Sequence, residues 1–201
     1  ENNANVIIFD IDTFGGRVDA ATQIKDIILD SKVTTIAFIN KRAISAGALI
    51  ALSCDSIFMT PGASIGAATA VDLQGNKASE KVISYMREEM ASTAEANNRS
   101  RGVATAMVDE ELSIDFLLNM QGDTLTAKDV EGFAEGKLIT LSTQLAVQLG
   151  IAGGEFERIE DVLKYLGLEN VEQKNTEESW SEKLVRFLTN PVVAPLFMSL
   201  G

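Results

Sequence analysis

The sequence predicts an α/β fold organised around a parallel β-sheet. Residues 6–12 and 33–39 form two apolar, β-branched runs of the kind found in strands buried on both faces of a parallel sheet. Between them, Asp19 is placed to cap a segment in which apolar residues recur at helical spacing, so the three segments together predict a β-α-β unit. With 201 residues, 46% of them hydrophobic, the chain can bury one sizeable core.

The other expected elements alternate between helices and short strands. In chain order, the patterns predict helices at 45–52, 79–101, 142–149 and 159–166 and strands at 56–60 and 138–140. The last two helices are followed by Gly150 and Gly167, the residue type suited to a left-handed C-cap. The polar segment 72–78, with Gly75 near its centre, offers little apolar area to hold it down and predicts a mobile loop.

The composition changes near the C-terminus. Residues 172–179 are nearly all polar or charged and are typical of a linker, whereas 180–201 form an amphipathic segment with an apolar end. We therefore expect a folded domain at 1–171 and a tail at 172–201. The chain begins at Glu1 rather than Met and closes on the apolar run, so we expect an excised piece of a longer protein. No run reaches the ~18 apolar residues that a membrane-spanning helix requires.

Charge and composition exclude several classes of site. Lysine and arginine total 17 against 29 for aspartate and glutamate, and the net charge of −12 makes nucleic acid an unlikely partner. The chain contains no histidine, which excludes a Ser-His-Asp triad, a Cys-His dyad and a histidine-based zinc site. The one cysteine, Cys54, lies in an apolar run and is expected to be a buried small side chain. We predict no metal and no cofactor.

One pair of acidic residues could carry phosphoryl chemistry. Asp10 and Asp12 end the first apolar run, where two carboxylates at i and i+2 could hold Mg²⁺ with Asp10 as the nucleophile. This arrangement resembles the haloacid-dehalogenase phosphatases, although Thr13-Phe14-Gly15 stands where their pattern has Gly-Thr. The simpler interpretation is a pair of polar residues at the open edge of a sheet.

A second combination could carry acyl transfer. Gly15-Gly16 after a buried strand can expose backbone N–H groups, and Ser45 at a helix N-terminus places a hydroxyl beside more of them. Both features also have plain structural roles, as a glycine turn and an N-cap. Without histidine, the base for the serine must be Lys, Asp, Glu or Tyr, and a neutral lysine is suitable.

Three ordered motifs resemble a known family. Asp12-Thr13-Phe14-Gly15-Gly16, residues 43–48 (Ala-Ile-Ser-Ala-Gly-Ala) and residues 59–67 (Met-Thr-Pro-Gly-Ala-Ser-Ile-Gly-Ala) resemble, at matching intervals, the membrane-bound NfeD-type serine proteases. The likeness continues through 137–142 and 146–150, so it covers most of the chain. These proteases belong to the Clp protease, signal peptide peptidase A and crotonase-like superfamily. The resemblance therefore implies the α/β Clp protease/crotonase-like fold of repeated β-β-α units.

The chain departs from the family pattern in three places. Phe14 stands where relatives commonly have proline, so the glycine turn can be set differently. Residues 110–136 have no close match and are expected to be an insertion. Relatives also carry a further strand and helix before the segment that corresponds to Val6, and this sequence starts almost at that strand.

The resemblance implies a role for individual residues. Ser45 matches the family nucleophile, Lys81 fits the position of its lysine base best, and Lys77 is the alternative. A lysine can take the serine proton only when its amine is neutral, which requires nearly complete removal from water. The oxyanion hole corresponds to the backbone N–H groups of Gly15, Gly16 and Ala46. The residues expected to bind the substrate are Phe14, Gly62, Ile65, Gly66, Ala67 and Ala68.

The resemblance also implies a function and a setting. We expect a serine endopeptidase that cleaves apolar segments of membrane-associated proteins, with a stomatin-like protein as partner, acting as a homodimer or larger homo-oligomer. The protease domain is expected outside the cytoplasm, anchored to the membrane through segments outside this chain, with 172–201 as a membrane-proximal tail. The alternative from another class is a catalytically silent binding or scaffolding module on the same fold.

Overall fold

The computed structural model describes residues 4–71 and 75–176. The chain divides into two units, Glu1–Gly167 and Leu168–Gly201, and the fold below is that of the first. The expected amphipathic helix within 180–201 and the centre of the expected loop, 72–74, lie outside the described residues. The domain boundary after residue 171 stays a prediction.

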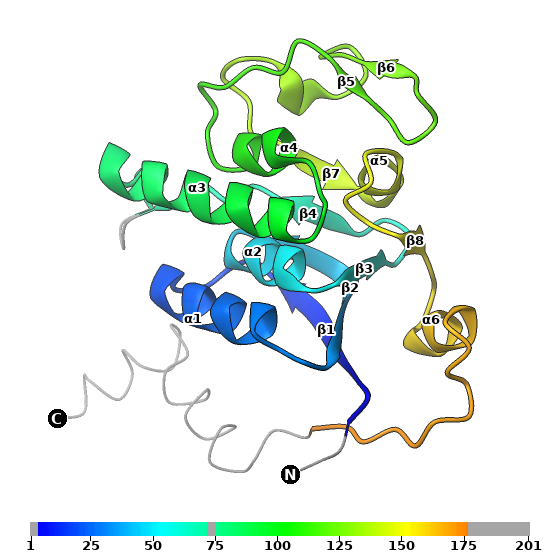
Figure 1. The fold of residues 1–201 in the computed structure, drawn as a ribbon. Coiled ribbons are helices and arrows are strands. Elements are labelled where there is room, and N and C mark those ends of the chain that lie inside the picture. The colour runs from blue at the N-terminus through cyan, green and yellow to red at the C-terminus, as the bar shows by residue number, and fades with distance from the viewer. Residues whose placement is uncertain (1–3, 72–74, 177–201) are drawn as a thin grey trace, which may run out of the picture. The chain divides into compact units, whose positions relative to one another are not determined.

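A six-stranded sheet lies at the centre of the first unit (Figure 1). Its strands are β1 (Val6–Thr13), β2 (Thr34–Ile44), β3 (Ser56–Met59), β4 (Ser64–Gly66), β7 (Thr140–Ser142) and β8 (Gly154–Glu155). The order is β7-β4-β2-β3-β8, with β1 paired to the other side of β2. All neighbours are parallel except β4 and β7, so the predicted α/β fold with a parallel sheet is confirmed.

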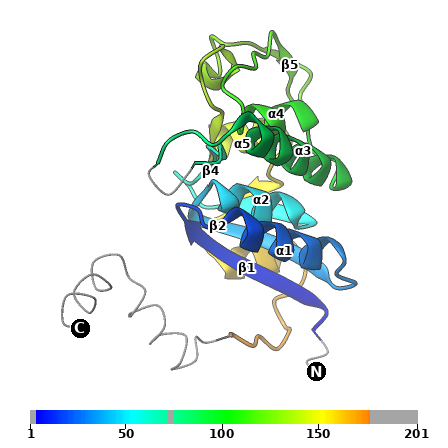
Figure 2. The same ribbon diagram turned by 90° about the vertical axis from the view of Figure 1, so that its left-hand side faces the viewer.

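Helices cover both faces of this sheet (Figures 1 and 2). The helices are α1 (Val18–Leu29), α2 (Ala46–Ser53), α3 (Glu80–Ala96), α4 (Arg101–Ala106), α5 (Thr143–Gln148) and α6 (Ile159–Tyr165). Because side chains alternate along β2, Ala37 and Ile39 join the main core with α2, whereas Ile36 and Phe38 pack with Val162 of α6 on the opposite face. Helix α2 is apolar on all sides, and its central position in the core explains that composition.

Two features of the first β-α-β unit differ from expectation. Strand β1 is an edge strand within the described sheet rather than one buried on both faces, and the side chain of Ile7 is 37% exposed. Helix α1 begins at Val18 with Arg17 as the N-cap residue, so Asp19 lies in the first turn and is not the cap.

The helix predicted at 79–101 ends five residues early, and a separate helix begins where the prediction ended. Helix α3 ends at Ala96, and Asn98 then takes a left-handed backbone conformation with φ 57°, which asparagine tolerates better than most residues. Helix α4 starts afresh at Arg101, where Ser100 Oγ accepts a hydrogen bond from the Val103 N–H. The change of direction brings α4 back against α3.

The segment 110–136 forms a small subdomain. It contains the hairpin strands β5 (Leu117–Leu118) and β6 (Thr124–Leu125) and the 3-10 helix η1 (Glu131–Phe133), at the end of the unit away from α1 (Figure 1). Phe133 is buried and ties the segment to the core.

No helix in the part of the chain that the structure describes is long and apolar enough to cross a membrane. Cys54 is buried as predicted, and burial raises the pKa of its thiol to about 12.

Candidate active site

Ser45 occupies the tight junction between β2 and α2. Its backbone has φ 57° and ψ −120°, a conformation that a residue with a side chain rarely adopts and that costs about 1–3 kcal/mol. Two hydrogen bonds hold it there: the Ser45 N–H donates to Gly66 O at 3.0 Å, and Ser45 O accepts from the Ala48 N–H at 2.9 Å. The side chain does not cap the helix. The predicted helix with Ser45 at its N-terminus is confirmed, and the hydroxyl has no structural partner in the described chain.

The glycine turn after β1 lies directly against Ser45. A Cβ atom on Gly15 would lie 2.8 Å from Ser45 Cβ and 3.1 Å from its Oγ, so only glycine fits. Gly15 also has φ +129°, which disfavours any other residue. The Thr13 hydroxyl fixes this turn, because its Oγ1 accepts from the Gly15 N–H and donates to Gly15 O, each at 3.1 Å.

The three N–H groups expected to form an oxyanion hole differ in availability. The Gly15 N–H is already bonded to Thr13. The N–H groups of Gly16 and Ala46 have no hydrogen-bond acceptor within residues 4–71 and 75–176. Ala46 is the first residue of α2, where the helix dipole adds partial positive charge. The geometry therefore offers two free donors beside the Ser45 hydroxyl.

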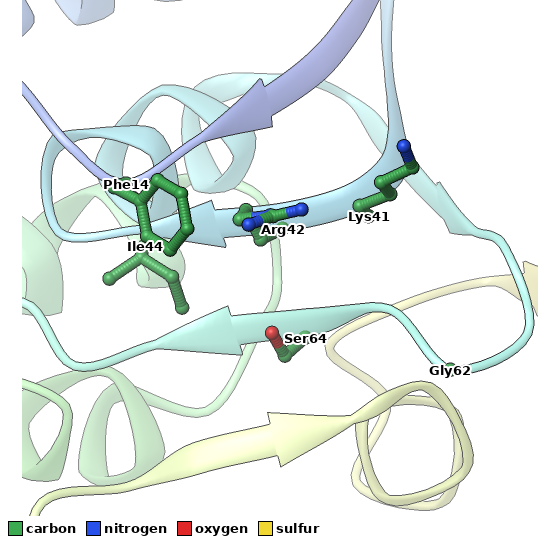
Figure 3. A pocket seen from close by; sticks show the side chains of 6 residues that line it. All are labelled: Phe14, Lys41, Arg42, Ile44, Gly62 and Ser64. Carbon is green, nitrogen blue, oxygen red and sulfur yellow. The ribbon is translucent and has the colours of Figure 1, made fainter.

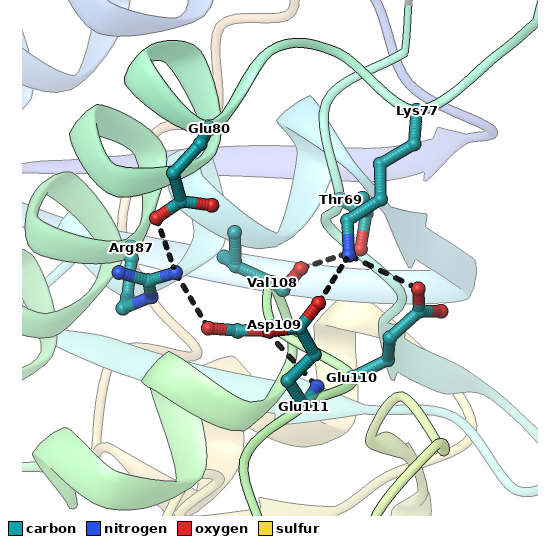
Figure 4. Close-up of polar contacts among 8 residues, drawn as sticks. All are labelled: Thr69, Lys77, Glu80, Arg87, Val108, Asp109, Glu110 and Glu111. Carbon is teal, nitrogen blue, oxygen red and sulfur yellow. Dashed lines mark hydrogen bonds and ion pairs between the residues drawn. The ribbon is translucent and has the colours of Figure 1, made fainter.

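The structure does not join Lys81 to Ser45. Lys81 is exposed on the first turn of α3 and makes no hydrogen bond or ion pair with a described residue. The neighbouring carboxylate of Glu80 is paired with Arg87 at 3.2 Å, and Arg87 also binds the buried carboxylate of Asp109 at 2.6 Å (Figure 4). This network ties the start of α3 to the segment that follows α4.

Lys77 has two acidic partners. Its Nζ lies 3.0 Å from Glu110 Oε1 and 3.8 Å from Glu111 Oε1 (Figure 4). The hydrogen bond that Lys77 donates to the Glu110 carboxylate raises the pKa of Lys77, which favours the charged amine. In this arrangement Lys77 is an ion-pair partner and cannot take a proton from a serine.

The residues expected to bind substrate divide into three groups. Phe14 and Gly62 line a recess of about 510 Å³ beside the β2–α2 junction (Figure 3). We call it the Arg42 recess; its other lining residues are Lys41, Arg42, Ile44 and Ser64. The side chains of Ile65 and Ala68 lie in the core and do not line it.

The backbone of the remaining two expected residues is already engaged. Gly66 O accepts from Ser45, and the Ala67 N–H donates to Ile139 O at 3.0 Å. A Cβ on Gly66 would lie 2.3 Å from Ile139 O, so this glycine is required by close packing of two backbones. In this structure Gly66 therefore positions Ser45, and Ala67 is bonded to the segment before β7.

Sequence reasoning missed several residues at the site. Thr13, Lys41, Arg42 and Ser64 were given no individual role, although Lys41-Arg42 is a basic pair just before the Ser45 motif in an acidic chain. Asp12, part of the phosphatase alternative, is ion-paired to Arg42 at 2.8 Å, and Asp10 is exposed. Among described residues, no three His, Cys, Asp or Glu side chains are grouped so that they could hold a metal ion.

Comparison with curated proteins identifies the family. The family model described as NfeD1b, N-terminal domain, matches residues 1–176. Membrane protein NfeD1b of Bacillus subtilis (strain 168) is 39% identical over 199 residues, which cover 99% of this chain and 42% of that protein. Membrane-bound protease PH1510 of Pyrococcus horikoshii is 29% identical over 213 residues, covering 100% of this chain and 45% of the protease. The chain therefore spans less than half the length of these relatives.

Solved structures confirm the predicted fold. A lysine-to-alanine variant of the 1510-N membrane-bound stomatin-specific protease, in complex with a substrate peptide, superposes with a TM-score of 0.72 and 25% identity. The match covers 94% of this chain and 84% of that one. ClpP1 from Listeria monocytogenes shares the fold, with a TM-score of 0.52 and 23% identity over 79% of this chain and 78% of its own. The chain belongs to the NfeD1b N-terminal domain family, on a fold shared with the Clp proteases.

Proposed function

We propose that this chain is the catalytic domain of a serine endopeptidase with a Ser45–Lys81 dyad. The observation that carries the proposal is the β2–α2 junction, where a strained serine stands beside two N–H groups that have no acceptor among the described residues. Family membership supports it, because one relative is named a membrane-bound protease. The absence of histidine leaves a lysine as the most suitable base.

In the proposed reaction, Ser45 Oγ attacks the carbonyl carbon of a peptide bond, and its proton passes to the Lys81 amine. The N–H groups of Gly16 and Ala46 receive the negative charge that develops on the carbonyl oxygen. The protonated Lys81 then gives its proton to the departing amine of the substrate, and an acyl-enzyme remains. Water activated by the neutral amine hydrolyses this ester and restores the serine.

The choice of Lys81 over Lys77 is supported by charge. Lys77 is held by Glu110, and this pairing favours the protonated amine. Lys81 has no such partner among the described residues, and Arg87 draws the Glu80 carboxylate into an ion pair. The relative solved with a substrate peptide carries a lysine-to-alanine change, a suitable way to hold substrate on an enzyme whose base is a lysine. Because Lys81 is exposed, we propose that closure of the 72–78 loop, a second subunit or bound substrate removes water from it.

We propose that the substrates are apolar segments of membrane-associated polypeptides, with a stomatin-like protein as the partner. The solved relative is described as stomatin-specific, and both curated relatives are named as membrane proteins or membrane-bound. The domain is proposed to act as a homodimer or larger oligomer outside the cytoplasm, held by an anchor outside this chain.

The alternative is a binding or scaffolding module without activity. One observation favours it: Lys81 and Ser45 are not hydrogen-bonded to each other in the described structure. Family and fold give no support to the phosphatase alternative at Asp10 and Asp12.

Labelling with a serine-reactive fluorophosphonate separates these functions. We expect one adduct, mapped by peptide mass spectrometry to the peptide that contains Ser45, with a rate that rises with pH because the base must lose its proton. Ser45→Ala should abolish the adduct and Lys81→Ala should slow it strongly, whereas Lys77→Ala should leave most of the rate. Labelling that persists in Ser45→Ala would show that the nucleophile is another residue. A folded wild-type chain that takes no label at any pH would favour the scaffolding module.

A further inference from the structure

We propose that the Arg42 recess selects substrates with an acidic side chain close to the scissile bond. The inference deepens the proposed function, since it names a feature of the polypeptide that would be cleaved. It also adds a polar requirement to the apolar preference expected from the family. Arg42 is the specificity-determining residue, and Lys41 supports it from the rim.

A bulge in β2 displays the two cations. Ile11 of β1 pairs with Ile39 of β2, and the next pair is Thr13 with Ala43. An advance of two residues along β1 is therefore matched by an advance of four residues along β2. The two extra residues lie in the stretch that contains Lys41 and Arg42. Bulges of this kind redirect side chains and are frequent beside functional sites.

Contacts from Thr60, the residue that follows β3, hold the bulge in place. The Thr60 N–H donates to Ile39 O at 3.0 Å, and the Thr60 hydroxyl donates to Asn40 O. Thr60 itself is buried, and its carbonyl accepts from Thr143 Oγ1 at 2.7 Å. The backbone that carries Lys41 and Arg42 is therefore part of the rigid sheet and not a loose loop.

The Arg42 side chain is held in one orientation, and some of its N–H donors have no partner among the described residues. Its guanidinium carbon lies 4.4 Å from the centre of the Phe14 ring, and its Nε is ion-paired to Asp12 Oδ1 at 2.8 Å. The two Nη groups make no hydrogen bond to a described residue, and neither does Ser64 Oγ. A planar guanidinium held on an aromatic ring with free N–H groups is suited to bind a carboxylate.

The charge of the recess contrasts with that of the whole chain. The net charge of the chain is −12, but the side chains that line the recess contribute two positive charges, and among the described residues only Asp12 forms an ion pair with them. Lys41 is exposed and makes no ion pair within the described residues. An acidic substrate side chain would therefore meet net positive charge here, whereas most of the surface would repel it.

The recess lies within reach of a substrate bound at Ser45. Arg42 precedes Ser45 by three residues, about 10 Å at ~3.3 Å per residue of strand. Ile44, the residue before Ser45, forms part of the recess wall. An extended substrate with its scissile carbonyl at Ser45 can therefore place a side chain two or three residues away in the recess.

Peptide binding tests this proposal without requiring turnover. Short Leu/Val/Ala peptides that carry one Glu at successive positions are compared with the matched Gln set, with the Ser45→Ala chain as receptor and fluorescence anisotropy as readout. We expect Glu to bind about tenfold more tightly than Gln at one or two positions. The ratio should fall as salt is raised. Equal binding of the two sets at every position would overturn the proposal.

Three substitutions in the Ser45→Ala background locate the effect. Arg42→Gln should bring the Glu/Gln ratio close to one, and Lys41→Glu should lower it at an exposed position where folding is not at risk. Lys32→Gln, which removes a charge just before the other end of β2, is the matched control and should leave the ratio unchanged. A ratio that survives both Arg42→Gln and Lys41→Glu would overturn the assignment. Failure of the proposed function is detected by a different measurement: the fluorophosphonate would label the Ser45→Ala chain as fully as the unchanged chain.

Discussion

The two ends of helix α2 differ in how completely their backbone groups are satisfied. At the C-terminal end, Asn97 Nδ2 donates to the carbonyls of Leu52 and Ser53 at 2.9 and 3.1 Å. Arg99 donates to four carbonyls, those of Leu52, Cys54, Asp55 and Ile151, at 2.9–3.1 Å. Burial lowers the pKa of Arg99 to about 10, so it stays charged at neutral pH and also complements the helix dipole.

The N-terminal end is arranged in the opposite way. Ser45 is strained, its side chain does not cap the helix, and the N–H groups of Gly16 and Ala46 lack acceptors in the described chain. Gly16 is exposed, so water can accept from its N–H, whereas Ala46 is buried, and a buried N–H without a protein partner suits an acceptor on a ligand. The comparison indicates that the helix is anchored at its far end so that its near end can remain open.

The largest expected effect concerns catalytic activity at the N-terminal end of α2. Ser45→Ala and Lys81→Ala should each lower peptide cleavage by about 10³-fold or more, because both act in one proton transfer. The double variant should be about as inactive as either single variant, which steady-state kinetics on an apolar peptide would show. Lys81→Arg should also fail, since a guanidinium keeps its proton. Lys77→Ala is the control and should stay active. If Lys77→Ala is inactive and Lys81→Ala is active, the base is Lys77.

The second prediction concerns the C-terminal end of α2, where the backbone carbonyls are hydrogen-bonded. Arg99→Ala should lower the free energy of unfolding by about 3 kcal/mol, because it leaves the carbonyls of the buried residues Cys54 and Ile151 without a donor. Chemical denaturation measures this change. Arg101→Ala, at an exposed arginine paired with Glu88 and Glu95, is the matched control and should have little effect. The fluorophosphonate should still label the folded fraction of Arg99→Ala, and a loss of labelling equal to that of Ser45→Ala would contradict the separation of the two ends.

Much of this arrangement follows from local sequence. The strands at 6–12, 33–39 and 56–60, the helix after Ser45 and the glycine stops after α5 and α6 were predicted correctly, because hydrophobic periodicity and cap residues act over a few neighbours. The strand expected at 138–140 lies instead at Thr140–Ser142, and the short strands β4 and β8 were not predicted. The break between α3 and α4 was missed, because the mostly polar and charged residues 95–101 also suit the exposed end of a helix, whereas Asn98 turns the chain there. The hairpin in 110–136 was not predicted, because its two strands are too short to carry a periodic pattern.

The motifs of the candidate site can be seen in the sequence, but the contacts between its residues cannot. Ser45 and the glycine turn stand out as motifs, whereas the Arg42 recess depends on a register shift between β1 and β2. The partner of Lys77 is 33 residues away in sequence, at Glu110, so no local pattern reveals it. Long-range pairing of this kind is fixed by tertiary packing.

The third prediction tests the contact between the glycine turn and Ser45. Gly15→Ala should lower the free energy of unfolding by about 2 kcal/mol, because it combines the cost of φ +129° with a Cβ only 2.8 Å from Ser45 Cβ. Gly16→Ala is the matched control, since its Cβ would meet only Ala46 Cβ at 4.0 Å. Thermal unfolding of both variants measures the difference. Equal stability of the two would show that the turn does not press on Ser45 in solution.

The smallest expected effect measures the strain at Ser45 itself. Ser45→Gly and Ser45→Ala both remove the hydroxyl, so both should be inactive, and they differ only in the cost of the backbone conformation. Alanine keeps the penalty of φ 57° and ψ −120°, whereas glycine accepts these angles readily. Ser45→Gly should therefore unfold with a free energy about 1 kcal/mol higher than Ser45→Ala, measured by urea titration at matched slope. If Ser45→Ala is the more stable of the two, the entropy that glycine adds to the unfolded state outweighs the backbone strain. The strain energy at residue 45 is then smaller than its φ and ψ angles suggest.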